Sequence, residues 1–295
     1  YKRQVGSFLK TRGSNIVKPT FIGIGAQKCA STWLYRILAE HPEVGVGQEK
    51  EIDFFSYHYD HGYQWYESQF VECVGKRAIG EISPSYFCEP AVPARIKRYL
   101  PDAKILVSFR DPVQRALSNH RHEVRVGHLT GEDLAFEAGL ENNPMYTEQG
   151  RYATHLKRWL DHYPQEQILV VLQEDIAEDP VAVTKKVYEF VGVDAGFEPE
   201  QLNKKYNPSY ANRSRILTNV KDQIYALTKF PAMRWLWKFG DMIGLKRLYR
   251  SINTVPSDEV IPAPNETTIK KLRETFHPEV EELSKILERS LEAWK

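Results

Sequence analysis

The sequence has little of three things: cysteine, long apolar runs and net charge. Its three cysteines (Cys29, Cys73 and Cys88) are an odd number and lack the close spacing of metal ligands. They argue against a disulfide scaffold and favour a reducing, cytoplasmic setting. The longest uninterrupted apolar run covers only residues 168–172, far short of the ~18 residues of a membrane span. We expect a cytoplasmic location, unless an anchor ahead of Tyr1 has been removed.

The charges almost cancel, with 40 Lys and Arg against 39 Asp and Glu. Nucleic-acid-binding proteins usually carry a large positive excess, so we expect no nucleic-acid partner. A small anionic ligand held by a few local cations remains compatible with this balance. No repeat or low-complexity linker divides the chain, which predicts a single domain over residues 1–295. Within it we expect an N-terminal extension (1–18), a helical cap or acceptor-side insertion (203–265) and a C-terminal helix (266–295).

Short apolar strands alternate with amphipathic helices over the first 190 residues. The pattern predicts strands at residues 20–25, 78–82, 104–109 and 167–173. It predicts helices at residues 31–40, 91–100, 113–125, 152–162 and 181–191. Strands separated by helices imply a parallel sheet covered on both faces. The predicted fold class is α/β, with a central parallel sheet flanked by helices and a helical C-terminal cap.

A strand, a turn and a helix follow one another between residues 20 and 40. This arrangement aims backbone N–H groups and a helix dipole at one point, which suits a phosphate. The turn is P-loop-like, but counting G-x-x-x-x-G-K-[ST] from Gly25 puts Ala30 in the second Gly position and Ser31 in the Lys position. The cation stands at Lys28 instead. The alternative is a plain turn with Ser31 as helix cap and a solvated lysine. The candidate ligand-binding residues are Gln27, Lys28, Cys29, Ala30, Ser31, Thr32 and Trp33.

Four further segments occur in the order typical of one enzyme family. Residues 107–118 contain R-x-P followed by R-A-x-S, residues 50–55 read K-E-x-x-F-F, and residues 80–86 read G-E-x-S-P-x-Y. Residues 150–180 follow an order seen in many bacterial members. Together with the turn after Gly25, these segments resemble the sulfotransferases that use 3′-phosphoadenosine 5′-phosphosulfate (PAPS), and in particular their bacterial and heparan-sulfate branches.

Three positions depart from that family pattern. Ala30 stands where glycine is commoner, so the backbone there must accept a Cβ. Ile82 stands where the heparan-sulfate enzymes have a substrate-side lysine, which argues against a polysulfated glycan as the acceptor. The C-terminal third contains no cysteine, although the Golgi enzymes have a disulfide there. These departures favour the bacterial, cytoplasmic type.

The resemblance implies a transferase that moves a sulfuryl group from PAPS to an acceptor hydroxyl on a glycan, a lipid or a small metabolite, releasing PAP and needing no metal. Lys28 and the neighbouring amides would hold the 5′-phosphate, and Lys28 would also neutralise charge as the S–O bond breaks. Arg110 and Ser118 would bind the 3′-phosphate, where a guanidinium fits bidentately. Arg213 and Arg215 would close over the phosphates. The alternative for Arg110 is a structural ion pair with Asp111 or another neighbour.

For the acceptor proton, the resemblance assigns the role of general base to Glu51. The adjacent Phe54 and Phe55 would desolvate its carboxylate. Lys50 would touch substrate or sulfate, although Glu-Lys-Glu at 49–51 is also compatible with a solvated charge run. Glu81 and Ser83 are further acceptor-side candidates, and Glu81 could instead orient the loop lysine. Three histidines are rival bases: His58, His120 and His122.

Residues 204–250 carry eleven Lys or Arg against two Asp, with interleaved aromatics. Segment 221–250 is compatible with amphipathic helices packed on the sheet. It is also compatible with an acceptor-binding cap or a peripheral membrane patch. Two other functions stay open: a P-loop nucleotide or small-molecule kinase, disfavoured by Ser31 in the Walker lysine position, and a non-catalytic nucleotide-binding protein of the sulfotransferase type.

Overall fold

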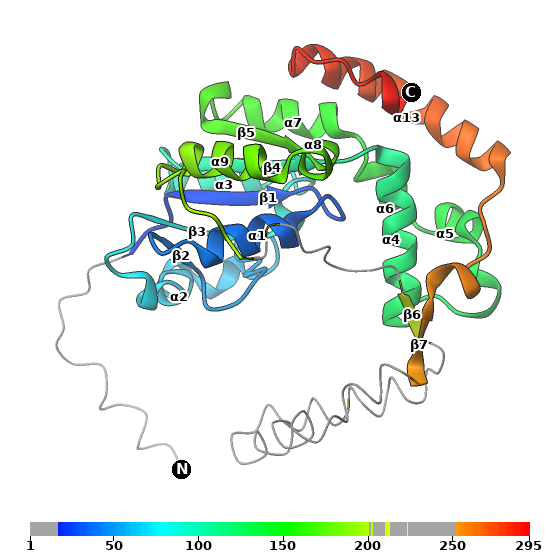
Figure 1. Ribbon diagram of the computed structural model, residues 1–295, viewed down its shortest axis with the longest axis horizontal. Helices are drawn as coiled ribbons and strands as arrows, with labels where there is room; N and C mark the ends of the chain where they lie inside the picture. Colours follow the sequence, from blue (N-terminus) through cyan, green and yellow to red (C-terminus); the bar gives the residue numbers. More distant parts are fainter. Residues whose placement is uncertain (1–16, 201, 203–209, 213–222, 224–251) are drawn as a thin grey trace.

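The structure of the protein is a computed structural model that describes residues 17–200, 202, 210–212, 223 and 252–295 (Figure 1). Three predicted features therefore lie outside the described residues. They are Arg213 and Arg215, the extension up to residue 16, and segment 221–250 apart from Gln223. Of the predicted cap, the structure describes residues 210–212, 223 and 252–265.

A five-stranded parallel sheet forms the centre, in the order β2-β3-β1-β4-β5. The predicted α/β fold is confirmed, and each of the four predicted strands is present within one residue at either end. The fifth strand, β2, was not predicted, because three residues are too few to show a periodicity. The strands are β1 (Phe21–Gly25), β2 (Val44–Val46), β3 (Ala78–Ile82), β4 (Lys104–Phe109) and β5 (Ile168–Leu172).

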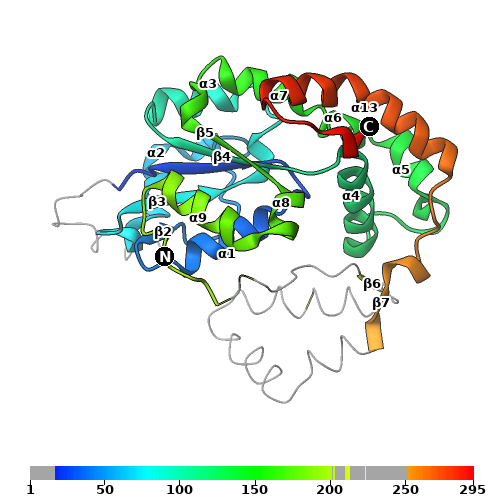
Figure 2. The same ribbon diagram turned by 45° about the horizontal axis from the view of Figure 1, so that its top comes forward.

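Helices cover both faces of the sheet (Figure 2). The helices are α1 (Ser31–Glu40), α2 (Tyr63–Ser68), α3 (Val92–Tyr99), α4 (Pro112–Val126), α5 (Phe136–Asn142), α6 (Met145–Glu148), α7 (Tyr152–Leu160), α8 (Gln173–Glu178), α9 (Pro180–Val191) and α13 (Glu266–Ile286). Short 3-10 turns lie at Tyr59–His61, Val71–Cys73, Pro84–Tyr86, Gly131–Leu134, Gln165–Gln167, Ser257–Glu259 and Glu292–Trp294. Side chains of α1 and α9 share one core with one face of the sheet, and those of α3, α4 and α7 share a larger core with the other face.

The central strands are buried on both faces, as their continuous apolar sequences predict. In β1, Phe21 points to the core of α1 and α9, whereas Ile22 points to the larger core. Leu106 and Val107 divide in the same way in β4. Each fully buried side chain of this size contributes ~1.5–3 kcal/mol through the hydrophobic effect. The result is a rigid sheet whose strand ends hold the loops described below.

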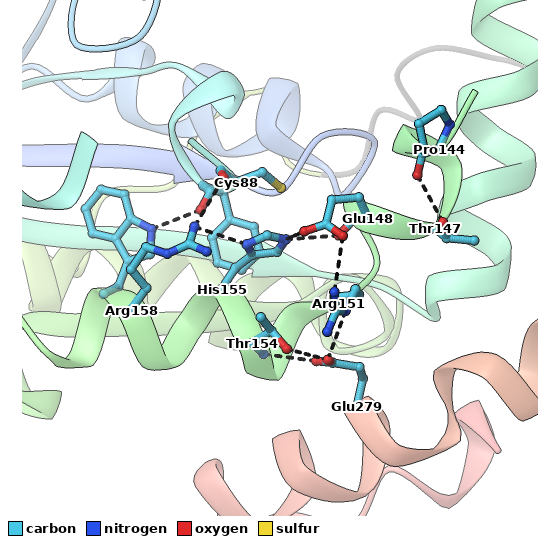
Figure 3. Close-up of polar contacts among 11 residues, drawn as sticks. Cys88, Pro144, Thr147, Glu148, Arg151, Thr154, His155, Arg158 and Glu279 are labelled. Atoms are coloured by element: carbon cyan, nitrogen blue, oxygen red, sulfur yellow. Dashed lines mark hydrogen bonds and ion pairs between the residues drawn. The ribbon is translucent and has the colours of Figure 1, made fainter. Parts of the chain in front are cut away.

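The C-terminal helix α13 packs against α7 and α4. Glu279 of α13 accepts a hydrogen bond from the backbone N–H of Thr154 (2.9 Å) and lies 3.4 Å from Nε of Arg151 (Figure 3). Arg273 of the same helix donates to the carboxylate of Asp111 at the start of α4 (3.2 Å). The C-terminal helix predicted within 266–295 is present over Glu266–Ile286, and a 3-10 turn at Glu292–Trp294 follows it.

A small antiparallel sheet joins the two described ends of the predicted cap. Strand β6 (Tyr210–Asn212) pairs with β7 (Thr254–Pro256) next to α4. Among the helices that the structure describes, none is both long and apolar enough to cross a bilayer.

Candidate active site

The candidate site lies at the carboxyl edge of the sheet, where the loops after β1, β3 and β4 meet. Strands β1 and β4 are neighbours, and the backbone N–H of Ala26 donates to the carbonyl of Ser108 (2.8 Å) at their ends. The chain after β1 continues into α1 on one face, whereas the chain after β4 continues into α4 on the other. Open α/β sheets bind ligands at such a switch point, because the diverging connections leave a crevice there.

The turn between β1 and α1 contains two non-glycine residues in the left-handed region. Their φ angles are 66° at Lys28 and 69° at Ala30. Ala30 is the N-cap of α1, so Ser31 is the first helical residue and not the cap that a plain turn would use. No side chain caps this helix, which leaves its first N–H groups, at Ser31 and Thr32, available to a ligand. Left-handed residues within a turn also make neighbouring N–H groups converge into an anion-binding concavity.

The ammonium of Lys28 stands beside this uncapped helix start. It is half-buried and makes no hydrogen bond or ion pair with any described residue. Burial, and to a smaller extent the charge of Arg125, lowers the pKa of Lys28 to about 8, although Glu123 and Glu51 partly oppose the shift. A desolvated cation next to free amide groups favours binding of a phosphate or a sulfate.

Arg110 directly follows β4, one strand away from Lys28. Its expected alternative, an ion pair with Asp111, does not form. The Asp111 carboxylate instead accepts two backbone N–H groups at the start of α4 (2.8 and 3.1 Å) and pairs with Arg273 (3.2 Å). Among the described residues, Arg110 has no hydrogen-bond or ion-pair partner. Ser118 lies two turns into α4 and is partly exposed, so the edge of the sheet presents a second free cation and a hydroxyl.

A buried arginine lies beneath the turn. Arg115 is fully buried and donates to the side chain of Gln149 (2.9 Å) and to the carbonyl of Tyr146. Gln149 in turn donates to Gln27 of the turn (3.2 Å). Both partners of Arg115 are neutral, and its Nε has no partner. In the sequence, only the arginine of the R-A-x-S motif pointed to this cluster. Nothing in the sequence marked Gln149 as its partner.

Two of the candidate loop residues turn their side chains into the core. The Cys29 thiol lies 3.4 Å from the hydroxyl of Tyr152, and burial raises its pKa to about 11. The indole of Trp33 is 7 % exposed, packs with the core of α1 and α9 and donates to the carbonyl of Leu202 (3.4 Å). Only the backbone of Cys29 and Trp33 therefore faces the ligand side of the turn.

Glu51 and Lys50 form an ion pair on the other side of the site. The Glu51 side chain keeps 46 % of its surface exposed, and that of Lys50 keeps 23 %. Phe54 and Phe55 are fully buried in the core behind them. The expected desolvation of the Glu51 carboxylate by these rings is therefore wrong in this structure, because the rings point inward and the carboxylate points out.

One face of α4 completes the surroundings of Lys28. His122 lies 2.7 Å from the guanidinium of Arg125, and burial together with the charge of Lys28 lowers the pKa of His122 to about 4. Glu123 and Arg125 are the two α4 charges that influence Lys28. Neither was singled out from the sequence, although Ser118, His122 and Arg125 follow a helical i, i+4, i+7 spacing that predicts a shared face.

The other rival bases lie in different settings. His120 is buried, with its ring nitrogens 3.0 Å from the hydroxyl of Tyr146 and 2.9 Å from the carbonyl of Leu134. Both nitrogens are occupied, which indicates a structural histidine. His58 is exposed and stacks on His61 with their ring centroids 5.1 Å apart.

Glu81 and Ser83, the expected acceptor-side residues, are both buried. The Glu81 carboxylate accepts hydrogen bonds from Tyr66 (2.7 Å), Tyr86 (2.9 Å) and Ser83 (2.6 Å). Burial raises the pKa of Glu81 to about 7, and the three hydroxyls partly offset that effect. With protein partners at both oxygens and 1 % exposure, Glu81 is placed to hold its neighbours and not to touch an acceptor.

A Mg²⁺-dependent kinase would need a free carboxylate after a neighbouring strand. The carboxylate of Glu174, after β5, accepts from the backbone of Asp111 (3.1 Å) and the indole of Trp294 (3.1 Å). Asp175 forms a bidentate ion pair with Arg289 (2.5 Å for both bonds). Both carboxylates are engaged, which weakens the kinase alternative. Within the described ranges, no group of three or more His, Cys, Asp or Glu side chains is placed to hold a metal ion.

Comparison with known proteins gives a family for this arrangement. The chain is 36 % identical over 196 residues to the heparan sulfate glucosamine 3-O-sulfotransferase 3B1 of Homo sapiens, covering 64 % of this chain and 50 % of that protein. It is 32 % identical over 127 residues to the membrane-associated sulfotransferase kil1 of Dictyostelium discoideum, covering 42 % and 27 % of the two chains. The chain thus spans half or less of the length of these curated relatives.

A solved structure gives the same family over more of the chain. The crystal structure of a sulfotransferase from Alicyclobacillus acidocaldarius superposes with a TM-score of 0.67 at 26 % identity, covering 95 % of this chain and 99 % of that one. The sulfotransferase domain profile matches residues 18–226, which include the turn at Lys28, Glu51 and Arg110. The chain therefore belongs to the sulfotransferase domain family.

Proposed function

We propose that the protein is a PAPS-dependent sulfotransferase that moves a sulfuryl group to an acceptor hydroxyl. The observation that carries this proposal is a pair of cations at the ends of adjacent strands, Lys28 and Arg110, that have no partner in the part of the chain that the structure describes. The uncapped start of α1 follows Lys28 in the same turn. Two separate cationic positions suit a small donor with phosphate at two separate places, and the near-zero net charge of the chain suits one small anionic ligand.

In this proposal the donor lies across the ends of β1 and β4. The N–H groups of Ser31 and Thr32 and the ammonium of Lys28 hold the 5′-phosphosulfate, and Arg110 with Ser118 holds the 3′-phosphate. As the bond between sulfur and the bridging oxygen breaks, negative charge develops on the 5′-phosphate. Lys28 stabilises that charge, because a fixed cation in a partly desolvated site interacts strongly with it.

Glu51 acts as the general base of the transfer. Its carboxylate accepts the proton of the acceptor hydroxyl while the new O–S bond forms, and the electrons of the broken S–O bond leave with PAP. Lys50, paired with Glu51, holds the carboxylate in place until the acceptor arrives. The location of Glu51 supports this role, because its charge is close enough to Lys28 to raise the pKa of that lysine. General base catalysis of this kind contributes ~10²–10⁴-fold in rate.

The acceptor we propose is not a polysulfated chain. The charges around Lys28 alternate in sign, with Lys50 and Arg125 opposed by Glu51 and Glu123. A polyanion would require a surface of one sign. Ile82, which replaces a family lysine, is buried and offers no cation. A neutral or weakly charged hydroxyl on a glycan, lipid or metabolite fits this mixed surface better.

The test uses the whole chain and PAPS labelled with ³⁵S. Calorimetry with PAP, and separately with ATP and Mg²⁺, shows which nucleotide binds. Transfer of label is then measured to three acceptors: heparan sulfate, 4-nitrophenol and a hydroxylated lipid in mixed micelles. PAP binding with transfer to one acceptor supports the proposal. Binding of MgATP without PAP supports the kinase alternative, and PAP binding without transfer to any acceptor supports the non-catalytic one.

A further inference from the structure

The loop that carries Glu51 is hydrogen-bonded to the segment after β3. We call residues 50–55 the base loop. The backbone N–H of Asp53 in this loop donates to the hydroxyl of Ser83 (3.0 Å), and the N–H of Phe55 donates to the hydroxyl of Tyr86 (3.3 Å). Two family motifs that are thirty residues apart in the sequence thus form one unit.

Both of these hydroxyls are themselves oriented by one buried carboxylate. Ser83 donates its hydrogen to Oε2 of Glu81 (2.6 Å), and Tyr86 donates to Oε1 (2.9 Å). A hydroxyl has a single hydrogen, so donating it to Glu81 leaves only lone pairs to face the base loop. Those lone pairs are what the N–H groups of Asp53 and Phe55 require. Glu81 therefore fixes the direction of both bonds without touching the loop.

The base loop needs such support because its backbone is strained. Glu51 and Asp53 both have left-handed φ angles, 66° and 53°, although neither is glycine. Residues persist in this region only when their surroundings determine their conformation. Two further bonds reach the loop without Glu81: Arg95 donates to the carbonyl of Phe55 (2.6 Å), and Ser85 donates to the carboxylate of Asp53 (2.5 Å). The two N–H bonds to Ser83 and Tyr86 are those that depend on Glu81.

We propose that Glu81 is a positioning residue for the transfer reaction: through Ser83 and Tyr86 it holds the base loop in the conformation that directs Glu51 at the acceptor. This inference rests on the proposed function of Glu51 as the base. It gives the buried carboxylate a role at a distance from the acceptor.

Tyr66 provides a matched control. Its hydroxyl also donates to Oε1 of Glu81 (2.7 Å), but it makes no hydrogen bond with the described residues of the base loop. The Tyr66 ring stacks on Phe54 of the loop (centroids 4.6 Å apart), and a phenylalanine at this position keeps that contact. Tyr66→Phe thus removes the same kind of bond from the same carboxylate as Tyr86→Phe. Ser83→Ala and Tyr86→Phe each remove one of the two hydrogen bonds that Glu81 orients, and both are small enough changes to keep the fold if Glu81→Gln does not.

Kinetics with ³⁵S-labelled PAPS, and with the acceptor that takes up label in the transfer assay, distinguish a positioning role of Glu81 from a packing role. We expect Ser83→Ala and Tyr86→Phe to lower kcat by ~10- to 100-fold, as small misplacements of a catalytic group do. The affinity for PAP should stay unchanged, because the donor residues are not connected to Glu81. Tyr66→Phe should keep kcat close to wild type. An equal loss of kcat in Tyr66→Phe and Tyr86→Phe would overturn the proposal.

Hydrogen exchange gives a readout that does not depend on activity. Ser83→Ala should speed exchange at the amide of Asp53, Tyr86→Phe at that of Phe55, Glu81→Gln at both, and Tyr66→Phe at neither. Unchanged exchange at both amides in Glu81→Gln would overturn the proposal, as would a general increase in Tyr66→Phe. If the wild type transfers no sulfuryl group, the proposed function fails, while the exchange pattern still shows whether Glu81 holds the loop.

Discussion

The two sides of the site differ in how their charges are partnered. On the donor side, Lys28 and Arg110 make no bond with any described residue. On the acceptor side, Lys50 is already paired with Glu51. Free cations are costly to leave half-buried, so their persistence indicates a place kept for an anion. The ion pair with Lys50 instead holds the Glu51 carboxylate in place before any ligand arrives. In the proposed reaction, the donor side is completed by its ligand, and the acceptor side is assembled beforehand.

A buried charged side chain lies beneath each side of the site, and the two differ in their hydrogen-bond partners. Glu81, under the base loop, has hydroxyl donors at both oxygens. Arg115, under the turn at Lys28, has two neutral partners and an Nε with none. A buried cation without a counter-ion is destabilised until negative charge comes near it. In the proposed reaction, Arg115 would therefore add to the field that favours a bound phosphosulfate, whereas Glu81 would hold the backbone of the base loop in place.

The largest effect we expect is on the acceptor side, from Glu51→Gln. This variant keeps the shape of the side chain but cannot accept the proton, so kcat should fall by ~10²–10⁴-fold. The affinity for PAP, measured by calorimetry, should stay within twofold, because the donor side does not depend on this carboxylate. If kcat stays near wild type, Glu51 is not the base, and the exposed His58 becomes the next residue to test.

The next effect is on the donor side, from Arg110→Ala. A charge-assisted hydrogen bond contributes ~1.5–3 kcal/mol, so the affinity for PAP should fall by ~10- to 150-fold. The matched control is Arg98→Ala, which removes an exposed arginine of α3 away from the strand ends. Adenosine 5′-phosphosulfate lacks the 3′-phosphate, so it should bind the wild type and Arg110→Ala equally. An equal loss for both nucleotides would mean that Arg110 does not contact the 3′-phosphate.

A smaller effect should appear on the proposed donor side, as a pH dependence of the affinity for PAP. The pKa of Lys28 lies at about 8, below its ordinary value, so the free protein loses this charge as the pH rises through 8. The phosphates of PAP, with second pKa values of ≈ 6, are fully ionised by then. The affinity for PAP should therefore fall by about twofold between pH 7 and 8, and by up to about tenfold between pH 7 and 9. Titration calorimetry at each pH measures this.

Lys28→Arg is the control for that dependence. A guanidinium stays charged at every pH in this range, so the variant should bind PAP with an affinity that does not change between pH 7 and 9. If the affinity for PAP falls equally with pH in the wild type and in Lys28→Arg, the pH dependence comes from a group other than Lys28.

The donor side could be predicted from the sequence far better than the acceptor side. Lys28, Ser31 and Arg110 follow strands with unmistakable apolar patterns, and the carboxyl ends of parallel strands meet at one edge. Position along the chain was therefore enough to place them together. The free state of Lys28 and Arg110 could not be predicted, because it depends on Asp111 finding another partner in Arg273, more than 160 residues away.

On the acceptor side, the motifs were visible but their relation was not. Glu81 and Ser83 read as polar residues after a strand, which is where ligands bind. Their burial comes from Tyr66 and Tyr86, whose hydroxyls reach the carboxylate only in the folded chain. The Glu51 side chain likewise points outward because its backbone is left-handed, and no sequence pattern predicts that conformation. Side-chain direction in irregular loops is set by tertiary contacts, and periodicity carries no information about it.

The smallest expected effect tests the strain in the donor turn, through Ala30→Gly. Ala30 has a φ of 69°, a conformation that costs a residue with a Cβ ~1–2 kcal/mol. Glycine removes this cost but loses ~0.5–1 kcal/mol through the entropy of the unfolded chain. The variant should therefore be more stable by up to ~1 kcal/mol, measured by urea unfolding, with unchanged PAP affinity. Ala94→Gly, in helix α3, should have the opposite sign, at ~1 kcal/mol less stable. A loss of stability in both variants would mean that the Ala30 methyl contributes more by packing than its conformation costs.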